Sequence, residues 1–261
     1  MNIGRYFPRS SPLHRYAALA VLISLGIFSS NAAAQRHFPP DSLENTQVIP
    51  RSTPVMNVVG TMRNFTSALG VRCQYCHVGT EGMSLDSFDF VSDKKRTKLV
   101  ARQMMRMVSE INHRLDTIPE RPASSVTVTC ATCHRGVSRP TTLAQRLADS
   151  VQVGGAESAI RDYKALRAQY FGRDSYDFGE LSLNVAAFRV ARAGKPEDAL
   201  QLLALNESFF PTSSGLSVFR GNVLLMKGDT TAAAASFREA IKRDAQNQEA
   251  RGRLRDIGRQ P

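Results

Sequence analysis

All four cysteines of the chain lie in two copies of one short motif, Cys-x-x-Cys-His. Residues 73–77 read Cys-Gln-Tyr-Cys-His, and residues 130–134 read Cys-Ala-Thr-Cys-His. This motif is typical of c-type haem attachment, in which both thiols bind the porphyrin covalently and the adjacent histidine supplies an axial nitrogen to the iron. The sequence therefore predicts two covalent haem c groups, with His77 and His134 as proximal iron ligands and the attachment made by Cys73, Cys76, Cys130 and Cys133.

Two other uses of paired cysteines stay open at this point. Four thiolates can hold a zinc ion, and cysteines of an exported protein can form disulfides. A gap of 53 residues separates the two Cys-x-x-Cys pairs, which is long for a zinc ribbon. No βαβ pattern of the kind expected around redox-active Cys-x-x-Cys motifs surrounds either pair. Haem is the interpretation that also uses both histidines.

The second axial ligand decides what such a haem does. A haem with two protein ligands transfers electrons, whereas an open position binds or activates small molecules. Of the five histidines, two are proximal and His14 belongs to the N-terminal segment considered below. His37 lies in a proline-rich stretch and His113 lies off the apolar stripe of its predicted helix, so we expect both to be solvated. Methionines are the remaining candidates.

A helix with a methionine on its apolar face is predicted before each motif. Residues 53–69 carry apolar side chains at helical spacing, and Gly70 can end this helix. Residues 92–115 repeat the pattern, with Ser92 or Asp93 as the expected N-cap. Methionines on such stripes usually fill a core, but two haems in need of ligands favour ligation. The candidates are Met62 for the first haem and, for the second, Met104 ahead of Met107 and Met105.

Residues 50–140 resemble the cytochrome subunit of photosynthetic reaction centres. The resemblance rests on Met62 before the first motif, on an Ala-Arg-x-Met string from Ala101 followed by Ile111-Asn112, and on Cys-His-Arg-Gly followed by Pro140. It implies a protein that transfers electrons rather than an enzyme, with Met62 and Met104 as axial ligands. The best-known members of that family carry four haems, whereas this chain has two motifs.

The first 34 residues have the pattern of a secretory signal peptide. Arg5, Arg9 and Arg15 precede an apolar stretch at 16–28 and three alanines at 32–34. We expect cleavage after residue 34, with an uncleaved membrane anchor as the alternative. The mature protein is then periplasmic, and residues 35–52 form a linker or a wrapping arm.

The C-terminal part, residues 142–261, contains no cysteine and repeats with a period of 34 residues. Small or apolar residues recur at the same offsets in both copies, and a glycine stands at each expected turn between helices. This region resembles tetratricopeptide repeats, with 156–171 as a flanking helix. Such repeats commonly bind proteins, although they can also only shield the neighbouring domain. The matched positions are Ala187, Gly194, Ala199 and Leu203 with Gly221, Gly228, Ala233 and Phe237.

The chain is basic, with 34 Lys and Arg against 23 Asp and Glu, but it lacks a nucleic-acid-binding module. The run at 94–98, Lys-Lys-Arg-Thr-Lys, either docks an acidic redox partner or is a solvated helix start. We therefore expect partner proteins, including a membrane-bound photosynthetic or respiratory complex, and no nucleic acid.

Taken together, these patterns predict a mainly α-helical protein with a dihaem cytochrome c domain at 53–141 and a helical repeat domain at 142–261. The expected function is single-electron transfer between redox proteins. Two alternatives remain: a peroxidase-type enzyme in which one haem has an open distal site, and a zinc or disulfide module whose repeats bind proteins.

Overall fold

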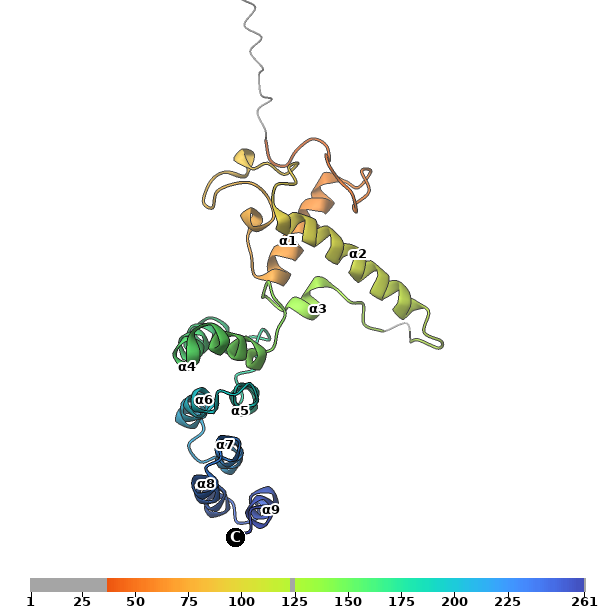
Figure 1. Cartoon of the computed structure of the whole chain (residues 1–261). Coiled ribbons are helices and arrows are strands. Elements are labelled where there is room, and N and C mark those ends of the chain that lie inside the picture. The colour runs from red at the N-terminus through yellow and green to blue at the C-terminus, as the bar shows by residue number, and fades with distance from the viewer. Residues whose placement is uncertain (1–36, 123–124, 261) are drawn as a thin grey trace, which may run out of the picture. The chain divides into compact units, whose positions relative to one another are not determined.

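A computed structural model describes residues 37–122 and 125–260 (Figure 1). Within these ranges the regular elements are helices, with one isolated β-bridge between Val78 and Asp89, so the mainly α prediction is confirmed. The predicted signal peptide at 1–34 and His14 lie outside the described residues. Among the helices that are described, none is long and apolar enough to cross a membrane.

Helix α1 (Val55–Leu69) confirms the helix predicted before the first motif. It ends at Gly70, which adopts a left-handed conformation (φ 65°, ψ 34°) and whose N–H caps the last turn through the carbonyl of Ser67. Two short 3₁₀ helices follow, η1 (Cys73–Tyr75) and η2 (Leu85–Ser87).

Helix α2 (Arg96–Asp116) begins four residues later than Ser92, the first residue predicted to cap it. The prediction that Ser92 or Asp93 caps this helix is wrong, because the preceding residue is Lys95 and no side chain caps the first turn. The Asp93 carboxylate instead accepts hydrogen bonds from the side chains of Arg102 and Asn45. The Asp93 side chain, which the sequence predicted as a helix cap, therefore forms an ion pair with Arg102 instead.

Helix α3 (Cys130–His134) is a single turn formed by the second motif itself. The segment that follows it contacts the end of α1, where the Gly136 N–H donates to the Ala68 carbonyl at 2.8 Å. A Cβ atom on Gly70 would lie 2.0 Å from the Gly136 carbonyl oxygen, so only glycine allows this approach. The chain entering the first motif and the chain leaving the second therefore touch.

Helix α4 (Leu143–Tyr170) is broken at Gly154 and Gly155, and its second half corresponds to the predicted flanking helix. Two helical hairpins follow, and their turns contain Gly194 (φ 81°) and Gly228 (φ 88°) as predicted. Because α5 starts at residue 180 and α7 at residue 214, equivalent helices are offset by 34 residues. The helices are α5 (Glu180–Arg192), α6 (Pro196–Phe209), α7 (Ser214–Lys227), α8 (Thr230–Arg243) and α9 (Gln248–Asp256).

The apolar core belongs almost entirely to helices α4 to α9. Their buried side chains form two clusters, and the second includes the Phe237 ring packed over Gly221. Among the described residues before Leu143, the buried hydrophobic side chains are Ala68, Phe88 and Val137. Residues 37–141 are thus folded into helices and turns with very little apolar core of their own.

Candidate functional site

The first Cys-x-x-Cys-His motif is a tight turn that directly follows α1. The Cys73 carbonyl accepts hydrogen bonds from the N–H groups of Cys76 at 3.2 Å and His77 at 2.9 Å. Because side chains three residues apart eclipse one another in a 3₁₀ turn, we expect both thiols to face one direction, as covalent attachment to one porphyrin requires. Burial raises the pKa of the Cys76 thiol, although a hydrogen bond from Thr97 and the charge of Lys95 oppose this.

Side chains from the N-cap and the first turn of α2 hold this turn in place. Lys95 Nζ donates to the Gln74 carbonyl at 3.0 Å, and the Thr97 hydroxyl donates to the Tyr75 carbonyl. Lys98 Nζ donates to three further carbonyls at 2.8–3.0 Å, those of Phe90, Val91 and Ser92. Solvation, one of the two roles predicted for the basic run, does not describe Lys95 and Lys98, because both ammonium groups bind backbone carbonyls. Docking of an acidic redox partner stays a prediction. The charge pattern of the sequence could not predict that Lys95 binds the carbonyl of Gln74, which lies 21 residues earlier in the chain.

His77 is partly buried, with its ring edge-on to the Phe90 ring at a centroid distance of 4.9 Å. Its Nδ1 atom is buried and has no hydrogen-bond partner among the described residues. Burial, with the nearby charges of Lys98 and Arg102, lowers the pKa of His77 to about 4. The imidazole is therefore neutral near pH 7, which is the form that binds a metal ion.

The second motif is held by a different set of contacts. Thr129 and Thr132 form a capping box at the start of α3, which fixes the first turn. His134 Nδ1 lies 2.9 Å from the Val137 carbonyl. A donated hydrogen bond from Nδ1 leaves the lone pair on Nε2, the nitrogen that would face an iron atom.

Asn112 of α2 fixes the chain just before this second motif. Its amide nitrogen donates to the Val128 carbonyl at 2.8 Å, and its amide oxygen accepts from the Val128 N–H at 2.8 Å. Asn112 belongs to the Ile-Asn pair noted in the sequence, but its role as a backbone clamp could not be predicted. The periodicity placed this residue only beside the apolar stripe.

The candidate methionine ligands lie on both long helices of this region. Met62 of α1 and Met105 of α2 are partly buried, whereas Met104 and Met107 are 36% and 46% exposed. Met104 shares an exposed apolar stretch of α2 with its neighbours Leu99 and Val100. These placements leave the choice of axial ligand a prediction.

The two remaining described histidines are exposed side chains. His37 is exposed and pairs with Asp41 at 3.2 Å, and His113 is exposed near the end of α2. Both were expected to be solvated, and the structure agrees.

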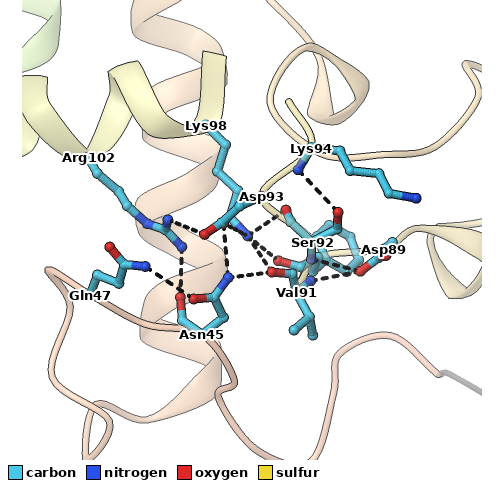
Figure 2. Close-up of polar contacts among 10 residues, drawn as sticks. Asn45, Gln47, Asp89, Val91, Ser92, Asp93, Lys94, Lys98 and Arg102 are labelled. Carbon is cyan, nitrogen blue, oxygen red and sulfur yellow. Dashed lines mark hydrogen bonds and ion pairs between the residues drawn. The ribbon is translucent and has the colours of Figure 1, made fainter. Parts of the chain in front are cut away.

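A buried arginine joins the N-terminal arm to α2 (Figure 2). The side chain of Arg102 is 9% exposed, donates to Asp93 Oδ2 at 2.8 Å and also donates to the Asn45 carbonyl at 2.8 Å. The Asn45 side chain completes the network by donating to the Val91 carbonyl and to Asp93. Hydrogen bonds from Arg102 and Asn45 hold the pKa of Asp93 well below its usual range. The arm thus closes over the loop that follows the first motif.

The residues present fit two haem groups. Residues 37–141 have few buried apolar side chains, and α2 carries an uncovered apolar face, so a large apolar cofactor would supply the missing core. The four thiols are not paired in disulfides. Across the described ranges, which include every cysteine, no three His, Cys, Asp or Glu side chains gather into a metal site.

A protein-family model described as "Photosynthetic reaction centre cytochrome C subunit" matches residues 31–199. This range includes both Cys-x-x-Cys-His motifs and helices α1 to α5. No curated protein shows a significant match to the chain.

Proposed function

The chain belongs to the photosynthetic reaction centre cytochrome C subunit family, and from that premise we propose that it is a dihaem cytochrome c that passes single electrons between redox partner proteins. The family match supports a c-type cytochrome electron carrier. The number of haems, their axial ligands and the redox partners are our proposals beyond that match.

The residues of each motif have separate tasks in this proposal. Cys73 and Cys76 hold the first haem and Cys130 and Cys133 the second, through thioether bonds. His77 and His134 bind the iron atoms on one side, and the thioether sulfurs of Met62 and Met104 bind them on the other. Haem iron with these ligands changes between the ferric and ferrous states by one electron, and a methionine ligand raises the reduction potential.

One observation carries the proposal: the region with both motifs is folded but nearly coreless. Its buried apolar side chains are Ala68, Phe88 and Val137, within the residues described before Leu143. On α2 an apolar face that includes Met104 and Met107 stays uncovered. A haem buries a large apolar surface, so two haems held against α1 and α2 would complete this core.

The proposed setting is the periplasm, with export directed by residues 1–34 and association with the membrane surface through the partner. That partner is a membrane-bound photosynthetic or respiratory complex, and the protein has no enzymatic role of its own. The 34-residue offset between the helical hairpins supports a tetratricopeptide-like region at 142–261, which we propose contributes protein contacts.

Absorption spectroscopy of the purified protein tests this function. We expect a pyridine haemochrome assay to give two covalent haems per chain, and the ferric protein to show the near-infrared band of methionine ligation. Met62→Ala and Met104→Ala should each remove about half of that band, because each leaves one of two irons without its thioether. Met226→Ala is the control, since Met226 is an exposed side chain of α7.

Absence of covalent haem from protein made in a host that matures cytochromes c would overturn the proposal. A five-coordinate haem in the unmodified protein would instead favour the peroxidase-type alternative. If Met104→Ala keeps the band and Met107→Ala or Met105→Ala loses half of it, the second ligand must be reassigned.

A further inference from the structure

Helix α2 contacts both haem-attachment segments, one near each of its ends. Lys95 and Thr97 reach the first motif, and Asn112 reaches the chain before the second. At 1.5 Å per residue, roughly 22 Å of helix axis separates Thr97 from Asn112. None of these three side chains lies within a Cys-x-x-Cys-His motif.

The contact with the first motif is made to the residues that its two cysteines enclose. Gln74 and Tyr75 are the only residues between Cys73 and Cys76, and α2 binds the carbonyl of each. The Gln74 contact is charge-assisted, because its donor is the Lys95 ammonium. The rotation of this turn, and with it the direction of both thiols, is therefore set by α2.

Lys98 links α2 to the surroundings of His77, the predicted proximal ligand of the first haem. Its ammonium donates to the carbonyl of Phe90 at 2.8 Å, and the Phe90 ring packs edge-on against His77. The His77 imidazole therefore packs against Phe90, whose backbone carbonyl is hydrogen-bonded to Lys98 of α2. Three polar side chains of the basic run, those of Lys95, Thr97 and Lys98, therefore act on the first attachment site.

The contact with the second motif imitates a neighbouring β-strand. Asn112 both donates to and accepts from the backbone of Val128 at 2.8 Å, and Val128 lies two residues before Cys130. A paired donor and acceptor of this kind fixes both the position and the rotation of the chain. The approach of the chain to α3 is thereby tied to α2.

We propose that α2 is a strut that sets the positions of both haem-attachment segments, with Lys95, Thr97 and Asn112 as its positioning residues. The inference rests on the proposed function, since it concerns how the two haems are held. It has a specific consequence: Lys95 and Thr97 govern the first haem, and Asn112 governs the second. A change at one end of α2 therefore disturbs one haem and spares the other.

The test compares matched variants of the full-length haem protein. Lys95→Met removes the ammonium that holds Gln74, and Lys94→Met removes the same charge from the adjacent, exposed side chain. Asn112→Leu removes both bonds to Val128. Its control is Ser109→Leu, because Ser109 is exposed on the polar side of the same helix and makes no side-chain hydrogen bond among the described residues.

The readouts are the near-infrared band and the two midpoint potentials from a redox titration. A variant with Cys130→Ser and Cys133→Ser keeps only the first attachment site, so the signal that it retains identifies the first haem. We expect Lys95→Met to shift the potential of that haem further than Lys94→Met does. Asn112→Leu should shift the other potential, or remove up to about half of the near-infrared band, while Ser109→Leu changes neither.

Several results would overturn the inference. One is Lys95→Met shifting the potentials no more than Lys94→Met, and another is Asn112→Leu leaving the second haem unchanged. A third is each variant shifting both haems equally, which would indicate a general loosening. Far-UV circular dichroism checks the fold. If Asn112→Leu does not fold, Asn112→Asp is used, which keeps the acceptor for the Val128 N–H and loses the donor. Failure of the proposed function is recognised separately, since the unmodified protein would then carry no covalent haem.

Discussion

Gly70→Ala is expected to destabilise the haem-binding region more than a glycine in a left-handed conformation ordinarily would. Gly70 has φ 65°, a conformation that costs a residue with a Cβ about 1–2 kcal/mol. The new Cβ would also lie 2.0 Å from the Gly136 carbonyl oxygen, so the two segments must separate. That movement breaks the 2.8 Å hydrogen bond from Gly136 to Ala68, which is worth about 1 kcal/mol. The total loss is therefore about 2–3 kcal/mol.

The chain offers a matched control at Gly82. This glycine has φ 82°, but a Cβ there would meet nothing within 4 Å, so Gly82→Ala carries only the conformational cost. Denaturant unfolding of the haem protein, followed by haem absorbance, should show Gly70→Ala to be less stable than Gly82→Ala by about 1 kcal/mol. Equal losses in the two variants would refute the close approach between the end of α1 and the segment after the second motif.

Three further predictions concern acid stability, the helical repeats and haem removal. The folded state lowers the pKa of Asp93, so the stability that its ionised carboxylate contributes is complete above its ordinary pKa and is lost as the pH falls below about 4. In acid unfolding curves, the Asp93→Asn variant should therefore lose less stability over this pH range than the unmodified protein does. Phe237→Ala empties a fully buried site over Gly221 and should cost about 3–5 kcal/mol in urea unfolding followed by far-UV circular dichroism, and a loss below about 1 kcal/mol would contradict the packing. Replacing all four cysteines by serine should leave amide-exchange protection in α4 to α9 and remove most of it from residues 37–141, whereas unchanged protection in both regions would contradict a haem-completed core.

Features that depend on neighbours in the sequence could be predicted from the sequence. The apolar spacing before the first motif and Gly70 gave helix α1 and its end, because a left-handed C-cap is a local requirement that glycine meets. Gly194 and Gly228 marked the turns between paired helices for the same reason. Period, turn chemistry and chain length determine such features without any knowledge of distant contacts.

The polar contacts that shape the candidate site depend on partners far along the chain. Ser92 or Asp93 was expected to cap α2, but the Asp93 carboxylate is bound by Arg102 nine residues away and by Asn45 of the arm. A buried arginine needs a compensating charge more than a helix needs a cap, since an unpaired buried charge costs several kcal/mol and a cap contributes about 1. The sequence shows the residue types, but it does not show whether Asp93 pairs with a buried arginine or caps a helix.

Helix α2 is amphipathic, but its polar side contacts the protein and its apolar side is exposed. Its polar side chains bind backbone carbonyls and the arm, whereas its apolar side chains at Leu99, Val100, Met104 and Met107 are left exposed. In an ordinary helical domain the apolar face is buried by protein, and the polar face meets solvent. Here the described residues contact the polar side and leave the apolar side uncovered, so the haem groups that we propose can pack against the apolar side. The two covalent haems that we propose would account for a helix whose fixed contacts are polar and whose apolar side chains stay exposed among the described residues.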